Sequence, residues 1–338
     1  MPLPPAKIKN ALFYGKVLVR RKMEAVKKEP KRKWHRNNVE VFIMVCFGAI
    51  FVFVFGYMPM FGIILAFKEG DNALNIMDAI LHSDWAEMGG FKNFYDFLTD
   101  PYFFEIIVNT LGFNLLNLAI SMPAPVIIAL LFNELKSVKL RKGIQFFTFL
   151  PHFVSIVVWV GIIHSLCDTQ TGVVNVILKN MGVIKQSIDF KGDPQYSWGL
   201  MISSGVLKGA GWGSIVYMAA IAGVDEELYD AAAIDGVNRL QKAWYITLPV
   251  VAPLFVLNLI LNLSNILENG AATMLLWQTP SNLEKTEVFS TFILKNGINE
   301  MLYSYATAAG FFQSIVGIIL LVLGNWLAKK ITGKGVIF

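Results

Sequence analysis

The chain has 338 residues, of which 55% are hydrophobic and 16% are charged, and its formal net charge is +5. A soluble domain carries about a quarter charged residues, so this composition excludes an ordinary soluble protein, and the small positive charge needs no nucleic-acid partner to explain it. The sequence lacks the alternating pattern of a membrane β-barrel, which leaves an all-α, polytopic membrane protein as the predicted fold class.

Six apolar segments are long enough to cross a bilayer, because a hydrocarbon core of about 30 Å needs about 20 helical residues. We expect six transmembrane helices, at about 40–67, 105–132, 145–167, 198–222, 248–268 and 304–328. Residues 39–338 are therefore predicted to form one transmembrane domain, and residues 1–38 to form a basic segment before it.

Lysine and arginine are distributed unevenly between the two sides of this domain. The first 38 residues and the loops on the same side hold 21 of the 29 basic residues, whereas the loops on the other side hold 7. Because basic residues accumulate on the cytoplasmic side of multi-pass proteins, both termini and the loop at 224–249 are predicted to be cytoplasmic. The basic amino-terminal run is expected to lie against anionic lipid.

Cysteine and histidine give no sign of a disulfide or a metal site. Cys46 and Cys167 lie in different predicted spans, and the four histidines do not have the spacing of metal ligands. The residues at 332–335 lack the upstream glycine and the hydroxyl residue of a phosphate-binding loop. We therefore expect no catalytic residue, no metal and no cofactor on this chain.

The fourth predicted span contains one charged residue, Lys208, close to Gly209 and Gly213. The two glycines have the spacing of a G-x-x-x-G pair, which predicts close helix packing. A charge within a span is a candidate functional residue. Lys208 is also within about ten residues of the outer end, where a lysine can extend its ammonium group to the interface, and both interpretations are open.

The loop at 224–249 is the most informative stretch of the chain. It is too rich in acidic and basic residues to lie in lipid. It contains two helix-forming pieces, at 226–234 and 237–247, and Gly236 provides the natural break between them. By itself, this pattern is also typical of an ordinary amphipathic loop helix.

The fifth predicted span carries four asparagines with spacings of four, three and four residues: Asn258, Asn262, Asn265 and Asn269. Such spacing places them on one side of a helix. Amides are costly in hydrocarbon unless they are paired, so this asparagine stripe must face other helices or a water-filled path. Hydrogen bonding between helices and a lining for substrate hydroxyl groups are both open. Three further side chains would add stacking surface and an amide donor to a substrate path: Tyr217, Tyr305 and Gln313.

The spacing within the 224–249 loop resembles the cytoplasmic EAA loop of ABC-importer permeases. That family has Glu-Ala-Ala, three residues, Gly, nine residues, then Ile, any residue, Leu and Pro. This chain matches it with Asp230-Ala231-Ala232, Gly236 and Ile246-Thr247-Leu248-Pro249, and departs from it only by Asp230 in place of the usual Glu. Three segments resemble the carbohydrate-uptake permeases that serve oligosaccharides or polysaccharide fragments: 57–62, 228–236 and 303–310.

The resemblance covers nearly all of residues 40–338 and implies a type I ABC-importer permease fold with six transmembrane helices. It also implies that this chain is one half of a heterodimer with a second permease subunit in a bacterial plasma (inner) membrane. Two copies of a cytoplasmic ABC ATPase would bind ATP and Mg. An extracellular solute-binding protein would deliver the carbohydrate.

In that family, the EAA loop forms a coupling helix that docks in a groove on the ATPase. By resemblance, Leu228, Ala231 and Ala232 would pack into the groove, Gly236 would permit a turn, and Leu248 with Pro249 would tie the loop to the fifth span. The residues expected to couple the chain to the ATPase are Leu228, Asp230, Ala231, Ala232, Asp235, Gly236, Leu248 and Pro249.

Other functions fit the sequence less well. An importer permease for a peptide, phosphate or amino acid would carry the same loop. A secondary transporter would usually need a buried carboxylate, and only Glu268 comes near a predicted span. A membrane scaffold would not need both the asparagine stripe and the coupling loop.

Overall fold

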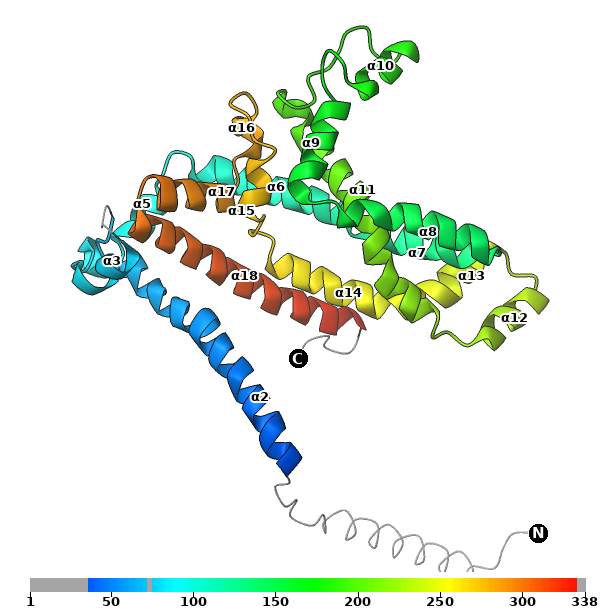
Figure 1. Cartoon of the computed structure of the whole chain (residues 1–338), viewed down its shortest axis with the longest axis horizontal. Helices are drawn as coiled ribbons and strands as arrows, with labels where there is room; N and C mark the ends of the chain where they lie inside the picture. Colours follow the sequence, from blue (N-terminus) through cyan, green and yellow to red (C-terminus); the bar gives the residue numbers. More distant parts are fainter. Residues whose placement is uncertain (1–35, 72–74, 333–338) are drawn as a thin grey trace, which may run out of the picture. The chain divides into compact units, whose positions relative to one another are not determined.

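The computed structural model describes residues 36–71 and 75–332 (Figure 1). These residues form helices and connecting loops, and the described ranges contain no strand beyond one isolated bridge between Lys68 and Trp85. The prediction of an all-α protein is therefore confirmed. The predicted basic segment at 1–38 lies almost entirely outside the described residues.

The chain divides into two compact units, residues 1–61 and 62–338. The described part of the first unit begins with α2 (Arg36–Val52) and continues into a π-helical turn, η1 (Phe53–Tyr57). The 3-10 helix η2 (Met58–Phe67) follows, and Pro59 lies in its first turn. Proline removes a backbone donor, which agrees with the change of winding at this point. Together these helices make an apolar stretch long enough to cross a membrane, Val39–Phe67.

The second unit begins within η2, continues with short helices and then enters a long, slightly broken one. The short helices are α3 (Ile76–His82), α4 (Glu87–Gly90) and α5 (Lys92–Leu98). The long stretch consists of α6 (Phe103–Ser121) and α7 (Pro123–Glu134). Pro123 is the first residue of α7, where its missing N–H costs little, so the second span runs almost where the sequence predicts it.

The third predicted span is broken. α8 (Val138–Phe153) and α9 (Ile156–Leu166) meet at 105°, whereas the sequence predicted one helix at 145–167. Ser155 explains part of the difference, because its side chain accepts a hydrogen bond from the N–H of Val158 and starts a new helix. Continuous hydropathy therefore concealed a sharp bend in the chain.

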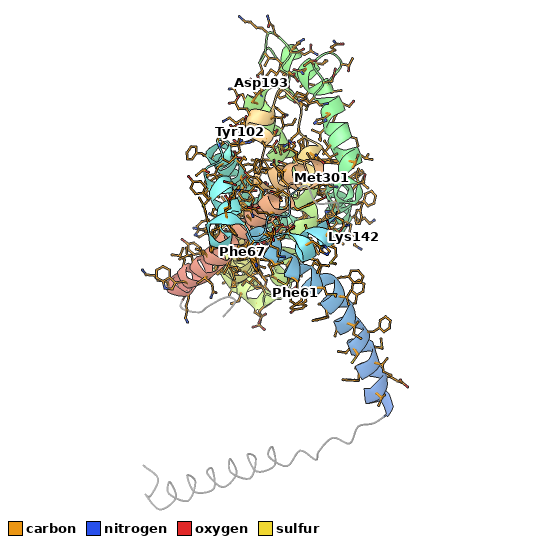
Figure 2. All side chains as sticks on the ribbon, turned by 90° about the vertical axis from the view of Figure 1, so that its left-hand side faces the viewer. Phe61, Phe67, Tyr102, Lys142, Asp193 and Met301 are labelled. Atoms are coloured by element: carbon orange, nitrogen blue, oxygen red, sulfur yellow. The ribbon has the colours of Figure 1, made fainter. Side chains whose placement is uncertain are left out.

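The fourth span is the 28-residue helix α11 (Pro194–Ile221), which follows α10 (Val173–Asn180). Asp193, labelled in Figure 2, caps α11 by accepting a hydrogen bond from the N–H of Gln195. Of the predicted G-x-x-x-G pair, Gly213 packs closely, because an added Cβ would lie 3.1 Å from the side chain of Pro125 in α7. Gly211 approaches α8 in the same way, with an added Cβ 2.3 Å from the carbonyl oxygen of Thr148. Gly209 instead has open space around it.

The coupling region and the fifth span follow without a long loop. α12 (Glu226–Ile234) lies at 81° to α11. α13 (Arg239–Lys242), the π-helical η3 (Ala243–Thr247) and α14 (Leu248–Ser264) then form one 26-residue helical stretch. This stretch ends at Ser264, four residues earlier than the sequence predicted.

The chain ends with three short helices, one π-helical turn and the sixth span. These are α15 (Ala271–Leu275), α16 (Leu283–Thr286), α17 (Phe289–Leu294), η4 (Lys295–Asn299) and α18 (Tyr303–Thr332). Asp71, which follows η2, caps α18, because its carboxylate accepts hydrogen bonds from the N–H groups of Ser304 (2.7 Å) and Tyr305 (3.4 Å). Burial raises the pKa of Asp71 above its ordinary value despite these two donors.

Two helix pairs frame the second unit: α14 runs beside α18, and α7 runs beside α11 (Figure 1). α14 and α18 approach most closely at Gly317, where an added Cβ would lie 2.7 Å from the carbonyl oxygen of Ser264. Within the described ranges, four single helices are long and apolar enough to cross a membrane, and the number rises to six if each bent pair counts as one span. These observations agree with a multi-pass membrane protein.

Candidate functional site

The first part of the site is α12, whose start and end are both built by local sequence. Asp225 accepts a hydrogen bond from the N–H of Glu227 (3.0 Å), and two acidic residues occupy the first turn. A carboxylate at this position satisfies a free donor and complements the positive end of the helix dipole. The helix therefore begins at Glu226, as the sequence predicts.

The end of α12 is a glycine-dependent turn. Gly236 has φ +73°, its N–H donates to the carbonyl of Ala233 (3.2 Å), and the N–H of Val237 donates to that of Ala232 (3.0 Å). These two bonds form a Schellman motif, which requires the left-handed conformation that glycine adopts most readily. An added Cβ would meet nothing within 4 Å, so the requirement is conformational and not steric.

A second cap starts the next helix two residues later. Asn238 accepts from the N–H of Gln241 (2.9 Å), and the Gln241 side chain accepts from the N–H of Asn238 (3.0 Å). This capping box satisfies two free backbone donors at once. Because α13 continues through η3 into α14, the coupling loop leads into the fifth span as one helical stretch.

Two hydrogen bonds fasten α12 to this stretch. The hydroxyl oxygens of Tyr229 and Thr247 lie 2.9 Å apart, and Nζ of Lys242 lies 3.3 Å from the carbonyl oxygen of Tyr229. Thr247 is only 1% exposed, whereas Tyr229 is half-buried, so the bond is shielded from water on the Thr247 side. Arg239 also lies 3.7 Å from Glu134 at the end of α7, but both side chains are open to solvent, and such a pair contributes little.

The predicted coupling residues fall into two groups. Leu228 and Ala231 are exposed, and so is Ile234, at 87%. Ala232 is buried within this chain instead, so the expectation that it packs into a groove on a partner is wrong. The other predicted coupling residues are exposed, except for Leu248, which is half-buried. They are Asp230, Asp235, Gly236, Leu248 and Pro249.

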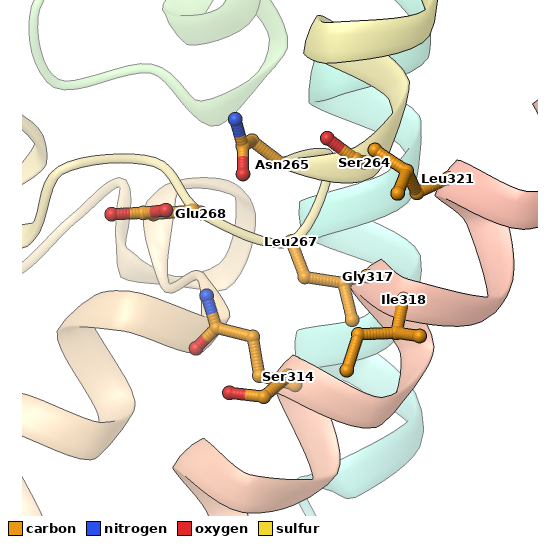
Figure 3. A pocket seen from close by; sticks show the side chains of 9 residues that line it. Ser264, Asn265, Leu267, Glu268, Ser314, Gly317, Ile318 and Leu321 are labelled. Carbon is orange, nitrogen blue, oxygen red and sulfur yellow. The ribbon is translucent and has the colours of Figure 1, made fainter. Parts of the chain in front are cut away.

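The second part of the site is a cavity of about 480 Å³ between the end of α14 and the middle of α18 (Figure 3). Its polar lining consists of two amides, two hydroxyl groups and one carboxylate, and no lysine or arginine contributes to it. In Figure 3, Asn265, Glu268 and Ser314 direct their polar ends to the same side of the cavity. The lining residues are Ser264, Asn265, Leu267, Glu268, Gln313, Ser314, Gly317, Ile318 and Leu321.

This set of groups suits a neutral, hydroxyl-rich ligand. Amides both donate and accept hydrogen bonds, as hydroxyl groups do, and a carboxylate accepts only. The apolar side chains of Leu267, Ile318 and Leu321 provide a surface for the carbon face of such a ligand.

The asparagine stripe does not act as one unit. Asn265 lines the cavity, whereas Asn258 donates to the hydroxyl of Tyr217 (3.3 Å) and Asn262 donates to the carbonyl of Asn258 (2.8 Å). Asn269 lies beyond the end of α14, so its predicted place on the same helix face is wrong. It exchanges two hydrogen bonds of 2.9 Å with Asn114 of α6.

The other predicted path residues are also divided. Gln313 lines the cavity, but Tyr217 is buried between helices, and its hydroxyl binds Asn258. Tyr305 donates to the carboxylate of Asp100 (2.7 Å) and packs against Phe97, away from the cavity. Of the seven residues predicted to line a substrate path, only Asn265 and Gln313 are among those that line this cavity.

Sequence reasoning missed three kinds of residue. Asn114 is an isolated amide in an apolar span, which is a signal for an interhelical bond. Ser264 and Ser314 carry no such signal, because a hydroxyl group can bond its own helix. Glu268 was considered only as a carboxylate near a span end. Within the described ranges, no three histidine, cysteine or carboxylate side chains could together hold a metal ion.

Comparisons with known proteins identify the family to which the chain is similar. The sequence model of the family described as binding-protein-dependent transport system inner membrane component matches residues 102–333. Protein LplB of Bacillus subtilis (strain 168) is 34% identical over 313 residues, which cover 93% of each chain. The polygalacturonan/rhamnogalacturonan transport system permease protein YteP of the same organism is 36% identical over 296 residues, covering 88% of this chain and 89% of YteP.

Two crystal structures are similar to most of this chain. One is of a bacterial ABC transporter involved in the import of the acidic polysaccharide alginate, with a TM-score of 0.78 and 33% identity over 88% of this chain and 97% of that chain. The other is of a bacterial alginate ABC transporter in complex with alginate pentasaccharide-bound periplasmic protein. Its TM-score is 0.78 and its identity is 32%, over 89% and 97% of the two chains.

Proposed function

The chain belongs to the family of binding-protein-dependent transport system inner membrane components, and we propose that it is one permease subunit of an ATP-driven importer of oligosaccharides or polysaccharide fragments. The proposal rests on the position of α12. This helix exposes an apolar surface, is fastened through Tyr229 to Thr247, and is thereby joined to α14, whose far end lines the polar cavity.

The energy is supplied by a separate cytoplasmic ATPase, present in two copies that bind ATP and Mg. Leu228, Ala231 and Ile234 form the exposed apolar surface of α12 and dock in a groove on that subunit. Closure of the ATPase dimer moves α12, and the bond between Tyr229 and Thr247 passes this movement to α14. The helices then move as rigid bodies and open the cavity to one side of the membrane at a time.

A second permease subunit completes the translocation path, and an extracellular solute-binding protein delivers the cargo. One of the similar structures contains a periplasmic protein with a bound alginate pentasaccharide, which supports a binding-protein partner here. The assembly lies in a bacterial plasma membrane with both termini of this chain in the cytoplasm, in agreement with the distribution of its basic residues.

The lining of the cavity favours neutral oligosaccharides. Related proteins are named for acidic polymers, but Glu268 is the one charged side chain among the lining residues. The carboxylate of Glu268 would repel a negatively charged sugar residue (a uronate) in this cavity, unless the second permease supplies a cationic side chain. The hydroxyl groups of a neutral sugar find donors and acceptors in Asn265, Gln313 and Ser314.

Purification of the chain with co-expressed candidate partners tests this function. We expect an ATPase and a second permease to co-purify, and a solute-binding protein loaded with a neutral oligosaccharide to stimulate ATP hydrolysis. Stimulation by a peptide-, phosphate- or amino-acid-loaded protein instead would retain the importer and overturn the carbohydrate cargo.

A further inference from the structure

The regular helical hydrogen bonds stop at the bend between α8 and α9, where the carbonyl of Pro151 accepts from the N–H of Val154 at 3.3 Å. The last turn of any helix has free carbonyls, and within a bilayer no water is present to bind them. Here the side chain of Lys208 reaches them from α11. Its Nζ lies 3.0 Å from the carbonyl oxygen of Pro151 and 3.2 Å from that of His152, and it also donates to the carbonyl of Val154.

This geometry assigns the charge in the fourth span. An ammonium group has three donors, and Lys208 directs its ammonium at three acceptors on one side. A positive charge at this position also complements the negative end of the α8 dipole. The ammonium group of Lys208 therefore points into the bend and binds its carbonyl groups.

Neighbouring contacts hold both arms of the bend to α11. Nε1 of Trp159 in α9 donates to the hydroxyl of Ser204 (2.8 Å), and the ammonium of Lys208 lies 5.8 Å from the centre of the Trp159 ring. On the α8 side, the rings of His152 and Trp212 stack with centres 4.7 Å apart and planes 3° from parallel. Lys208 lies between these two contacts in sequence and binds the bend itself.

The same helix leads directly to the coupling loop. α11 continues without interruption from Lys208 to Ile221, about 20 Å at 1.5 Å per residue. α12 starts at Glu226, only a short turn later. A movement of α12 on the ATPase therefore reaches Lys208 along a single helix.

We propose that Lys208 is a positioning residue that transmits the movement of α12, through α11, to the bend between α8 and α9. This inference rests on the proposed function, because it needs an ATPase that moves α12. It adds a second mechanical connection, to the third span, beside the one that Tyr229 and Thr247 make to the fifth. Removal of the Lys208 charge should uncouple the bend from α11. The rate of ATP hydrolysis that the loaded binding protein stimulates should then fall.

The test compares Lys208→Met, which keeps the length and removes the charge, with Lys208→Arg, which keeps the charge and several donors. Lys179→Met is the control, because Lys179 is exposed on α10. ATP hydrolysis per assembled transporter is measured against the concentration of loaded binding protein. We expect Lys208→Met to lower the maximal rate at least tenfold at an unchanged half-maximal concentration, and Lys208→Arg to restore most of it. A wild-type maximal rate in Lys208→Met would overturn the proposal.

A second variant decides the matter if Lys208→Met does not assemble. Ser204→Ala removes the hydrogen bond to Trp159 and leaves the charge in place, and we expect a smaller fall of the maximal rate of the same kind. A wild-type rate in Ser204→Ala, with Lys208→Met unassembled, would show that the contacts around the bend are only structural. If the wild-type transporter is not stimulated at all, the proposed function fails, and not this inference alone.

Discussion

The hydroxyl groups of Tyr229 and Thr247, eighteen residues apart, lie within hydrogen-bond distance and join α12 to the base of the fifth span. Thr247 is almost completely buried and Tyr229 is half-buried, so the bond is partly protected from competing water. The sequence pattern that identifies the loop has no requirement at this position. The resemblance implies that Leu248 and Pro249 tie the loop to the fifth span. In the structure, the hydrogen bond that joins α12 to this span is made one residue earlier, by Thr247.

Thr247→Val tests this connection. Valine has nearly the shape of threonine but leaves the hydroxyl of Tyr229 without its partner, which should lower the free energy of unfolding by about 1 kcal/mol. We expect basal ATP hydrolysis to persist and oligosaccharide uptake to fall several-fold. Tyr229→Phe removes the other partner, and the double variant should be no worse than either single one. Additive losses of uptake would contradict a shared bond.

Gly236 provides a test of the turn after α12. Because its φ is +73°, Gly236→Ala should cost about 1 kcal/mol of stability in the loop, Gly236→Val more, and Gly236→Asn less. Uptake should fall in the same order while the chain still inserts in the membrane. Gly143→Ala is the matched control, since Gly143 lies within α8 at a φ that is not positive and has open space around it. Equal oligosaccharide uptake by the three Gly236 variants and Gly143→Ala would contradict a role for the Gly236 turn in transport.

Gly317 determines how closely α18 approaches α14. Gly317→Ala places a Cβ against the carbonyl of Ser264, and we expect a loss of about 1–3 kcal/mol from overpacking. The thermal midpoint of the purified transporter should fall, and half-maximal uptake should need more substrate because the cavity changes shape. Gly310→Ala in the same helix has no atom within 4 Å of the new Cβ and should leave both quantities unchanged. Equal thermal midpoints and equal half-maximal substrate concentrations for Gly317→Ala and Gly310→Ala would contradict the role of Gly317 in the approach of α18 to α14.

Glu268 is predicted to select against acidic cargo. Glu268→Gln removes the charge from the cavity lining at nearly constant shape. Repulsion between two charges near a protein surface is worth about 1 kcal/mol or more, so uptake of a uronate-containing oligosaccharide should rise about fivefold relative to a neutral one. Competition between labelled neutral and acidic oligosaccharides measures the ratio, with the distant Glu300→Gln as control. An unchanged ratio in Glu268→Gln would remove Glu268 from the path.

The turn at 168–172, which follows α9, should stay folded in mildly acidic solution. Hydrogen bonds from the backbone N–H groups of Thr171 and Gln170 lower the pKa of Asp168 below its ordinary 3.8. The ionised carboxylate therefore stabilises the folded loop: this contribution is fully present above the ordinary value and is lost as the pH falls through the lower pKa of the folded state. Amide hydrogen exchange of the turn at 168–172 should accelerate only in that acidic range. Asp168→Asn should show no such step, and a step near neutral pH in the wild type would contradict the assignment.

Local signals predicted α12 well, because an acidic cap and a glycine are sufficient to define its bounds. The expected piece at 226–234 and the observed α12 have the same bounds. Long-range contacts were not predictable in this way. Hydropathy marks 145–167 as apolar, but it does not show the bend near Ser155, where Lys208 from another helix binds the carbonyls of Pro151 and His152. In the same way, periodicity placed Asn269 on the fifth span, although the chain leaves the helix at Ser264 and Asn269 pairs with Asn114.

The cavity was foreseen only in part for a related reason. Asn265 and Gln313 were expected to serve one path, and they do line one cavity. Tyr305 has an equally suitable side chain for sugar stacking, but Asp100 and Phe97 engage it elsewhere. A residue type indicates what a side chain can bind, whereas its position depends on partners that are distant in sequence.

Uptake by the reconstituted transporter tests the central claim most directly. The chain, with its co-purified permease and ATPase, is placed in lipid vesicles that contain ATP and Mg, and a binding protein loaded with labelled neutral oligosaccharide is added outside. We predict that the sugar accumulates only when ATP, ATPase and binding protein are all present, and that Thr247→Val lowers uptake more than it lowers ATP hydrolysis. Accumulation driven by a proton or sodium gradient without the ATPase would contradict the account and indicate an independent carrier.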